Sequence, residues 1–148
     1  MGCGSSAFLD GIKEILNVNC YGVDYSESQI ETANKAIPQG HFFVEEAIKL
    51  SLPNTEFDII FSHSVFQYFP NDDYVEEVLT TWCKQIKKGG KLVLMDLNDA
   101  SLEEVYHSER MLAYKTSSEY QTIYKDLNHL FLDKKSLSQR LESLGMLN

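Results

Sequence analysis

The sequence predicts an α/β fold in which a mostly parallel sheet is covered by helices on both faces. Short segments rich in Val, Ile, Phe and Tyr alternate along the chain with longer segments whose apolar residues recur at helical spacing. Gly, Pro or Ser stands at the breaks between segments, where helices start and stop. Strands that alternate with helices imply βαβ units and hence parallel strands. The 148 residues have the size of one domain, so we expect residues 1–148 to form a single domain.

Four segments are predicted to be strands: residues 19–23, 41–44, 57–62 and 91–96. The segment 57–61, Phe-Asp-Ile-Ile-Phe, is almost continuously apolar. Such a run is typical of a strand that helices cover on both faces. We therefore expect this strand near the middle of the sheet.

Five helices are predicted, over residues 6–16, 26–36, 72–87, 102–114 and 133–144. The densest basic group is interpreted as the end of the third helix, which the Gly89-Gly90 pair closes; it consists of Lys84, Lys87, Lys88 and Lys91. The last helix is amphipathic and carries Leu137, Leu141 and Leu144 on one face.

Composition and charge exclude several classes of function. The chain has 13 Lys and Arg against 22 Asp and Glu, a net charge of -9, so a phosphate backbone would repel it and nucleic acid is not an expected partner. No apolar run reaches the ~18 residues of a membrane span, and no membrane partner is expected. The three cysteines are odd in number, widely spaced and without a CxxC pair. Neither a disulfide framework nor a metal site is predicted, and we expect a reduced, cytoplasmic protein.

The segment Gly2-Cys3-Gly4-Ser5-Ser6-Ala7 opens the first predicted helix. Glycines there let the backbone approach a ligand, and a helix N-terminus offers unpaired N–H groups. Asp24 ends a predicted strand about 20 residues later, where a carboxylate can accept both hydroxyls of a ribose. This pair of features indicates a nucleoside-containing ligand, although Asp24 alone is also compatible with a carboxylate that only stabilises a helix start. The loop fits G-x-G-x-x-A, so a nicotinamide-dependent oxidoreductase is an alternative.

Five motifs, taken in order, resemble those of the class I S-adenosylmethionine-dependent methyltransferases. They are the glycine loop, Tyr21-Gly22-Val23-Asp24-Tyr25-Ser26, Glu46-Ala47 ahead of Leu52-Pro53, Phe57-Asp58-Ile59-Ile60-Phe61-Ser62, and Lys87-Lys88-Gly89-Gly90-Lys91-Leu92. The resemblance covers residues 2–96. It implies a Rossmann-like, doubly wound fold, S-adenosylmethionine as the cofactor, and transfer of a methyl group to an acceptor that we expect to be a small molecule.

The resemblance also implies which residues bind the cofactor. Gly2, Cys3 and Gly4 would lie against its methionine part. Asp24 would hold the two ribose hydroxyls, and Tyr25 would pack on the adenine face.

Three further positions follow from the same resemblance. Glu46 would accept a hydrogen bond from the adenine amino group, with Glu45 equally placed to do so, and the Ala47 amide would donate to a ring nitrogen. Ser62 would line the cleft near the sulfonium. His63 is the imidazole nearest to this cleft in the sequence, and is either a packed or solvent-facing strand-end residue or a proton acceptor for the methyl acceptor.

Residues 97–132 are rich in Tyr and follow the position where the family places substrate-specific insertions. A Tyr-rich lid over the substrate would suit a small polar or planar acceptor. Amphipathic Tyr is also common on ordinary half-buried helices, and we favour that interpretation.

The chain departs from the family's pattern at both ends. The family's first strand ends two positions before the first glycine, but here Met1 directly precedes Gly2. That strand normally lies between the strands that correspond to 19–23 and 57–62, and the family's last two strands are also absent. We therefore expect a truncated methyltransferase whose two flanking strands pair directly, accept a segment of a second chain, or leave an open centre. Direct pairing would compress the cofactor cleft, whereas insertion would restore it in a dimer. We therefore expect the isolated chain to bind the cofactor poorly and to be marginally stable or self-associate.

Two alternatives in which the protein is not an enzyme remain. Met1-Gly2-Cys3-Gly4-Ser5-Ser6 matches the myristoylation pattern M-G-x-x-x-[ST], which would make the protein a membrane-anchored binding module, but no polybasic segment follows. The departures at both ends would also suit a non-catalytic remnant that binds a partner.

Overall fold

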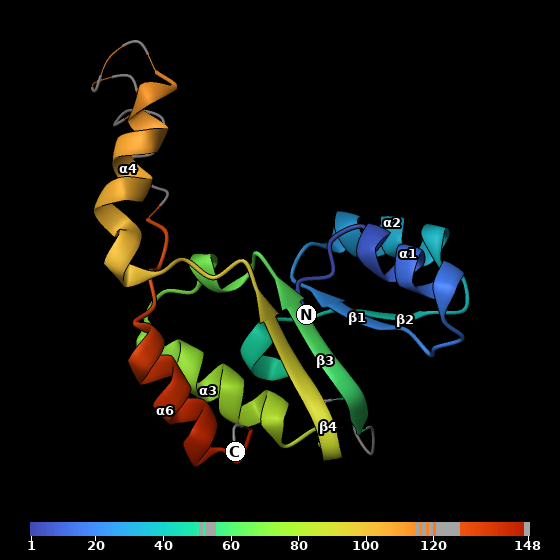
Figure 1. Cartoon of the computed structure of the whole chain (residues 1–148). Coiled ribbons are helices and arrows are strands. Elements are labelled where there is room, and N and C mark those ends of the chain that lie inside the picture. The colour runs from blue at the N-terminus through green and yellow to red at the C-terminus, as the bar shows by residue number, and fades with distance from the viewer. Residues whose placement is uncertain are drawn as a thin grey trace.

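The computed structural model describes residues 1–146 except 51, 53–55, 115, 117, 119 and 121–127. Its four strands form two parallel pairs, in which β1 (Tyr21–Asp24) pairs with β2 (His41–Val44) and β3 (Phe57–His63) pairs with β4 (Ile86–Met95). The predicted α/β class with parallel strands is confirmed. The described strands nevertheless form two two-stranded sheets and not one continuous sheet (Figure 1).

The helices accompany the two sheets separately. The helices beside β1 and β2 are α1 (Ala7–Ile15) and α2 (Glu27–Ala36), and those beside β3 and β4 are α3 (Asp72–Cys83) and α6 (Lys134–Ser143) (Figure 1). The helix α4 (Glu103–Leu112) extends away from the rest of the molecule. None of the helices among the described residues is long and apolar enough to cross a membrane.

The core lies between β3–β4 and α3. Four side chains of α3 are essentially inaccessible to solvent and pack with Phe66 and Ile60. These four are Val75, Val78, Leu79 and Trp82. The indole Nε1 of Trp82 donates a hydrogen bond to the Ala47 carbonyl over 2.9 Å, which satisfies the one polar atom of this buried ring. The predicted apolar face of α6 is confirmed, because Leu137, Leu141 and Leu144 pack against this core.

The third helix and the fourth strand differ from the prediction. The helix α3 ends at Cys83, and β4 already begins at Ile86, so the Lys-Lys-Gly-Gly segment lies within a strand and the expectation of a basic helix end was wrong. The strand register shifts here, from Phe57 opposite Ile86 to Ile59 opposite Lys91. Glycine permits this bulge, since Gly89 has φ +81° and a Cβ on Gly90 would lie 2.9 Å from the Asp58 carbonyl oxygen.

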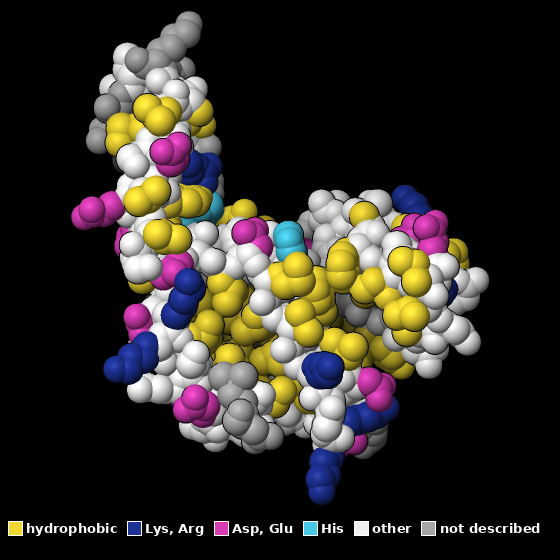
Figure 2. Space-filling model, viewed as in Figure 1, with side chains coloured by type: hydrophobic (Ala, Val, Ile, Leu, Met, Phe, Trp, Pro, Cys, Tyr) yellow, Lys and Arg dark blue, Asp and Glu magenta, His cyan; other side chains and the backbone are white. Residues whose placement is uncertain are grey.

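The two faces of β3 are covered to different degrees. Ile60 and Ser62 are buried on the face that packs on α3, but Ile59 on the opposite face is 57% exposed. On that opposite face α1 reaches only as far as Phe61, on which the ring of Phe8 stacks with centroids 4.2 Å apart. Hydrophobic side chains are correspondingly visible over β3 and the adjoining region (Figure 2).

No strand among the described residues lies between β1 and β3. Instead the first three residues bridge the two strands at their carboxyl ends: the Met1 amine donates to the Phe61 carbonyl over 2.8 Å, and the Cys3 N–H donates to the Val23 carbonyl over 3.0 Å. At the amino ends, the rings of Tyr21 and Phe57 meet edge-on with centroids 5.4 Å apart. Of the three arrangements expected from the sequence, direct pairing of β1 with β3 is therefore contradicted.

The buried Met1 amine makes stability depend on pH. Burial lowers the pKa of this amine from 8.0 to about 6. Between these values the unfolded chain binds a proton that the folded chain does not, so the free energy of unfolding should fall as the pH drops from 8 to 6. Two pKa units correspond to about 3 kcal/mol in all, and about 2 kcal/mol of this is lost between pH 8 and pH 6. Urea denaturation at pH 6 and pH 8 would measure the loss in a chain that begins with a free amine at Met1.

Acetylation of the same amine provides the control. An acetylated chain keeps an N–H for the Phe61 carbonyl but cannot bind the extra proton, so it should lose markedly less stability over this range. An equal loss in both forms would assign the pH dependence to other groups.

Candidate cofactor and active site

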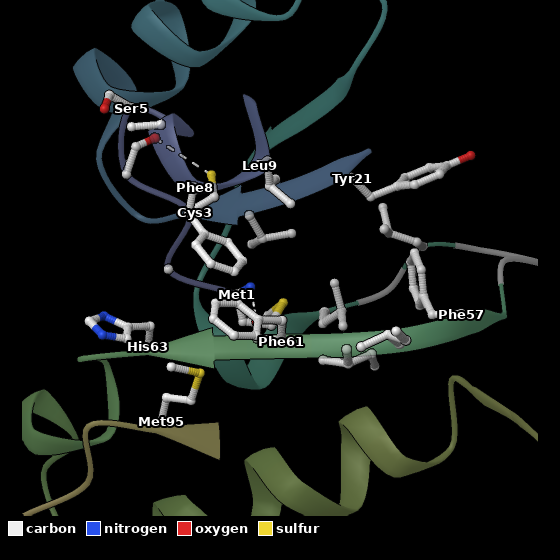
Figure 3. Close-up of a pocket in the computed structure, with 18 residues that line it drawn as sticks. Met1, Cys3, Ser5, Phe8, Leu9, Tyr21, Phe57, Phe61, His63 and Met95 are labelled. Atoms are coloured by element: carbon white, nitrogen blue, oxygen red, sulfur yellow. Dashed lines mark hydrogen bonds between the residues drawn. The ribbon is translucent and has the colours of Figure 1, made fainter. Parts of the chain in front are cut away.

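One cavity of about 500 Å³ lies between the two sheets and reaches their carboxyl edge. The loop Gly2–Ser5 and α1 border it on one side, and β3 borders it on the other (Figure 3). His63 and Met95 stand together at the carboxyl ends of their strands, while Tyr21 and Phe57 lie at the opposite end. In open α/β sheets, the carboxyl ends of the strands are where ligands bind.

The glycine loop adopts a backbone that glycine favours. Gly2 has φ +62° and Gly4 has φ +51°, and Ser6 at the N-cap of α1 also has a positive φ of 63°. A Cβ on Gly2 would lie 2.2 Å from Cγ2 of Val65. The loop therefore turns tightly over the segment that follows β3, which no larger residue at position 2 would permit.

We expect Gly2→Ala to destabilise the chain by at least about 2 kcal/mol. A left-handed backbone costs an alanine about 1–2 kcal/mol, and the contact with Val65 adds overpacking. Gly11→Ala is the matched control, because Gly11 lies in α1 with no atom within 4 Å of an added Cβ, and the change should stabilise α1 by roughly 0.5–1 kcal/mol. Urea denaturation of both variants would test this, and equal stability of the two would contradict the assigned role of Gly2.

Asp24 fastens the glycine loop to the end of β1. One carboxylate oxygen accepts the Gly4 N–H over 2.8 Å, and the other accepts the Ser26 N–H over 3.0 Å at the start of α2. Each oxygen retains a free lone pair, because a carboxylate offers about four acceptor sites. Asp24 can thus order the loop and still receive two hydroxyl groups of a ligand.

The expected adenine-side residues lie at the ends of β1 and β2. Tyr25 follows Asp24 and is 81% exposed, so its ring is available for stacking. The Glu45 N–H donates to the Asp24 carbonyl over 3.0 Å, which brings the end of β2 to the same edge. Glu46 is exposed and forms an ion pair with Lys49 at 3.2 Å, and Ala47 begins a short 3-10 helix. Tyr25, Glu45, Glu46 and Ala47 do not line the cavity. The glycine-loop residues Gly2, Cys3 and Gly4 do line it.

Ser62 and His63 occupy different environments. Ser62 is buried on the core side of β3, and its Oγ has no hydrogen-bond partner among the described residues. His63 instead lines the cavity at the carboxyl end of β3. The imidazole is therefore nearer to the open edge than the serine predicted to line the cleft.

His63 belongs to a hydrogen-bonded relay with Ser64 and Asp96. The His63 Nδ1 lies 2.8 Å from the Ser64 Oγ, and the Ser64 hydroxyl donates to the Asp96 carboxylate. A carboxylate can only accept, so the single hydroxyl proton of Ser64 is committed to Asp96. Ser64 must then accept from His63 Nδ1–H, which places the proton of the neutral imidazole on Nδ1 and leaves the Nε2 lone pair free to accept a proton.

Sequence reasoning missed Ser64 and Asp96 as site residues. Both are non-glycine residues with positive φ, 57° for Ser64 and 55° for Asp96, at the ends of neighbouring parallel strands. Backbone strain of this kind gathers at functional sites. The only sequence signal was their position at the carboxyl ends of the predicted strands 57–62 and 91–96, since nothing in the local sequence specifies a left-handed backbone.

A second polar cluster joins the base of α4 to residues 129–131. Arg110 donates to the Tyr106 hydroxyl, whose oxygen also lies within hydrogen-bond distance of His129 Nδ1, at 2.7 Å. Burial lowers the pKa of His129. The His129 ring also meets the Tyr68 ring edge-on, with centroids 5.2 Å apart, which links this cluster to the segment after β3. Several residues of the Tyr-rich stretch, among them Tyr124, lie outside the described residues.

A scan against protein-family models matches the chain to a family described as "Methyltransferase domain" over residues 1–94. The matched segment contains the glycine loop, Asp24 and all of β1–β3. This chain belongs to the methyltransferase-domain family. The methyl donor of this family is S-adenosylmethionine, as the resemblance implied.

Solved methyltransferases share the fold of this methyltransferase domain. The plantazolicin methyltransferase BpumL, in complex with a pentazolic desmethylPZN analog and S-adenosylhomocysteine, is 25% identical with a TM-score of 0.73, and the match covers 97% of this chain and 52% of BpumL. A methyltransferase of Thermotoga maritima is 20% identical with a TM-score of 0.66, covering 98% of this chain and 60% of its own. The domain thus spans about half the length of BpumL.

A curated relative matches a shorter segment. The nonribosomal peptide synthetase CymA of Salinispora arenicola is 39% identical over 57 residues, which are 38% of this chain and 1% of CymA. Chondramide synthase of Chondromyces crocatus is 38% identical over 53 residues, again 1% of that protein.

The described residues fit S-adenosylmethionine. The glycine loop presents close backbone to the cavity, Asp24 has acceptor sites free for two hydroxyls, and the exposed Tyr25 ring adjoins them. The residues at this carboxyl edge are therefore compatible with binding of the family's methyl donor.

Proposed function

We propose that the protein carrying this chain transfers a methyl group from S-adenosylmethionine to a small-molecule acceptor. The observation that carries the proposal is that the glycine loop and His63 line one cavity at the carboxyl edge, where Asp24 holds the loop through the Gly4 N–H. S-adenosylmethionine supplies the methyl group when it is bound. Gly2, Cys3 and Gly4 would contact its methionine part, and Asp24 its ribose.

The adenine end would be held at the ends of β1 and β2. Tyr25 would pack on the ring, Glu46 would accept from the amino group, and the Ala47 amide would donate to a ring nitrogen. Their placement beside Asp24 supports these roles. Ser62, buried behind His63, would position the strand end.

His63 would act as the proton acceptor for the methyl acceptor. The relay through Ser64 to Asp96 fixes its ring through Nδ1, and the ring lines the cavity. General-base assistance is useful for an acceptor nitrogen or oxygen that carries a proton. The remaining catalytic contribution is orientation of the acceptor in line with the methyl group.

The acceptor would lie between His63 and the region 97–132. Tyr68 is 64% exposed and adjoins the Tyr106–His129 cluster, which offers aromatic faces with polar tips. Such surroundings favour a planar, polar natural product, and BpumL is described in complex with azole analogs. The three free cysteines support a reducing, cytoplasmic location.

Calorimetry with two cofactors separates this function from the oxidoreductase alternative. We expect the full-length protein to bind S-adenosylhomocysteine at one site and to ignore a nicotinamide dinucleotide. Binding of the dinucleotide without binding of S-adenosylhomocysteine would refute the proposal.

A further inference from the structure

Asp96 places a carboxylate at the rim of the cavity, beside the imidazole of His63. Asp96 directly follows Met95, and its carboxylate accepts from Ser64, which directly follows His63. Met95 and His63 both line the cavity and stand together at one end of it (Figure 3). Asp96 is itself exposed, so a molecule bound at this edge can reach its carboxylate.

The carboxylate of Asp96 keeps the capacity to bind a further donor. Ser64 provides the one hydrogen bond that its carboxylate receives within the described part of the chain. An ionised carboxylate has about four acceptor sites, so most of them remain open. None of the described Lys and Arg residues forms an ion pair with Asp96. Its negative charge is therefore available to a bound cation.

An anionic acceptor would find no matching charge at this edge. The described residues that line the cavity include no Lys and no Arg. Two cations on neighbouring elements already have partners: Lys134 pairs with Asp99 at 2.6 Å, and the guanidinium carbon of Arg110 lies 5.1 Å from the centroid of the Tyr106 ring. A carboxylate or phenolate acceptor would instead be repelled by Asp96.

A cationic acceptor would gain from the same arrangement. An ammonium group only donates hydrogen bonds and a carboxylate only accepts them, so the two groups match in both charge and hydrogen bonding. The Nε2 lone pair of His63 provides a second acceptor beside the carboxylate, because Ser64 accepts from Nδ1–H. The rim thus offers two acceptors of different kinds, one charged and one able to take up a proton.

We propose that the methyl acceptor is an amine, which Asp96 holds as an ammonium ion and His63 deprotonates. This inference rests on the proposed methyl transfer and specifies the acceptor class for that site. Asp96 would receive one N–H of the ammonium group, and His63 Nε2 would receive another. Asp96 would therefore select the acceptor as well as fix the imidazole through Ser64.

Protons and electron pairs balance along this route. One proton passes from the ammonium nitrogen to His63 Nε2, which leaves a lone pair on the nitrogen. That lone pair forms the bond to the methyl carbon while the carbon–sulfur bond breaks, and its electron pair stays on the sulfur. The nitrogen becomes a methylated ammonium ion, which Asp96 can still bind, and His63 returns its proton to the solvent.

A comparison of benzylamine with benzyl alcohol would test the proposal without any turnover. The two probes share a planar ring, but near neutral pH the first carries an ammonium group and the second a neutral hydroxyl. NMR titration of the full-length protein would follow the amides of His63, Ser64 and Asp96. We expect benzylamine to bind about fivefold more tightly, the upper range for an exposed ion pair, both with and without S-adenosylhomocysteine.

Asp96→Asn separates recognition of the charge from orientation of the imidazole. The asparagine oxygen can still accept from Ser64, so the His63 tautomer should stay protonated on Nδ1 while the charge is lost. We expect the preference for benzylamine to disappear in this variant. Glu77→Gln removes the same charge from an exposed position of α3 and should leave the preference unchanged.

The position of the transferred methyl group provides a second readout. Para-hydroxybenzylamine carries an amine and a phenol on one ring, so the two acceptor classes compete within one molecule. With S-adenosylmethionine and the full-length protein, we expect the N-methyl product and not the methyl ether.

Three outcomes would overturn the proposal. One is equal binding of the two probes, or no saturable shift with benzylamine. Another is an Asp96→Asn variant that retains the preference for benzylamine. The third is the methyl ether as the main product. An Asp96-dependent preference in a protein that does not bind S-adenosylhomocysteine would instead refute the proposed methyl transfer and retain Asp96 as an amine-binding residue.

Discussion

Asp24→Ala should weaken binding of S-adenosylhomocysteine by about 10- to 100-fold in the full-length protein. The substitution removes the acceptor of the two ribose hydroxyls and also releases the Gly4 N–H that orders the glycine loop. The loss of hydrogen bonds to a charged group costs about 1–3 kcal/mol, which corresponds to this range. Calorimetry of the variant would measure it.

Two further variants isolate the cause of the loss. Asp24→Asn retains one acceptor oxygen and should bind with intermediate affinity. Glu31→Ala removes the same charge from an exposed position of α2 and should leave the affinity unchanged. Unaltered affinity in Asp24→Ala would show that this carboxylate only stabilises the turn into α2, where it accepts the Ser26 N–H.

His63→Gln should slow methyl transfer to a proton-bearing acceptor by about 10²- to 10⁴-fold, the usual contribution of a general base. Binding of S-adenosylhomocysteine should persist, because His63 acts on the acceptor. Single-turnover transfer of a labelled methyl group would measure the change. A rate equal to that of the unaltered protein would show that His63 lines the cavity but does not act as a general base.

The relay predicts a second, independent signature of His63. Nitrogen NMR should show the neutral imidazole protonated on Nδ1, because Ser64 accepts from that atom. Ser64→Gly removes the hydroxyl while keeping a residue that tolerates φ 57°, and it should shift the tautomer toward Nε2–H. Its effect on the rate should not add to that of His63→Gln, since the two residues act as one unit.

The sequence predicts those parts of the fold that depend on local pattern. The strand 41–44, the start of α3 and the leucine face of α6 follow from periodicity and capping, and the structure has them at or near the predicted bounds. The beginning of β4 was missed because Lys-Lys-Gly-Gly is typical of a helix end. Its actual conformation depends on the strand Phe57–His63 beside it, which a local pattern does not contain.

For the site too, the sequence predicts the residues that form a local pattern and misses those that depend on tertiary structure. The glycine loop and Asp24 have characteristic residue types at characteristic spacing, and the structure brings them into direct contact. The Ser64–Asp96 hydrogen bond joins residues 32 positions apart, and both residues have a positive φ. A periodic sequence pattern therefore does not predict it. The exposure of Ile59 likewise depends on the gap beside β3, a feature of the assembled sheets.

Chemical-shift mapping of S-adenosylhomocysteine on the isotope-labelled protein tests most directly that the carboxyl edge binds the cofactor. We expect the largest amide shifts in Gly2–Gly4, at Asp24 and Tyr25, and at Glu46 and Ala47, with α6 unaffected. Shifts confined to α6 and α4, or the absence of any saturable shift in the glycine loop, would contradict the account.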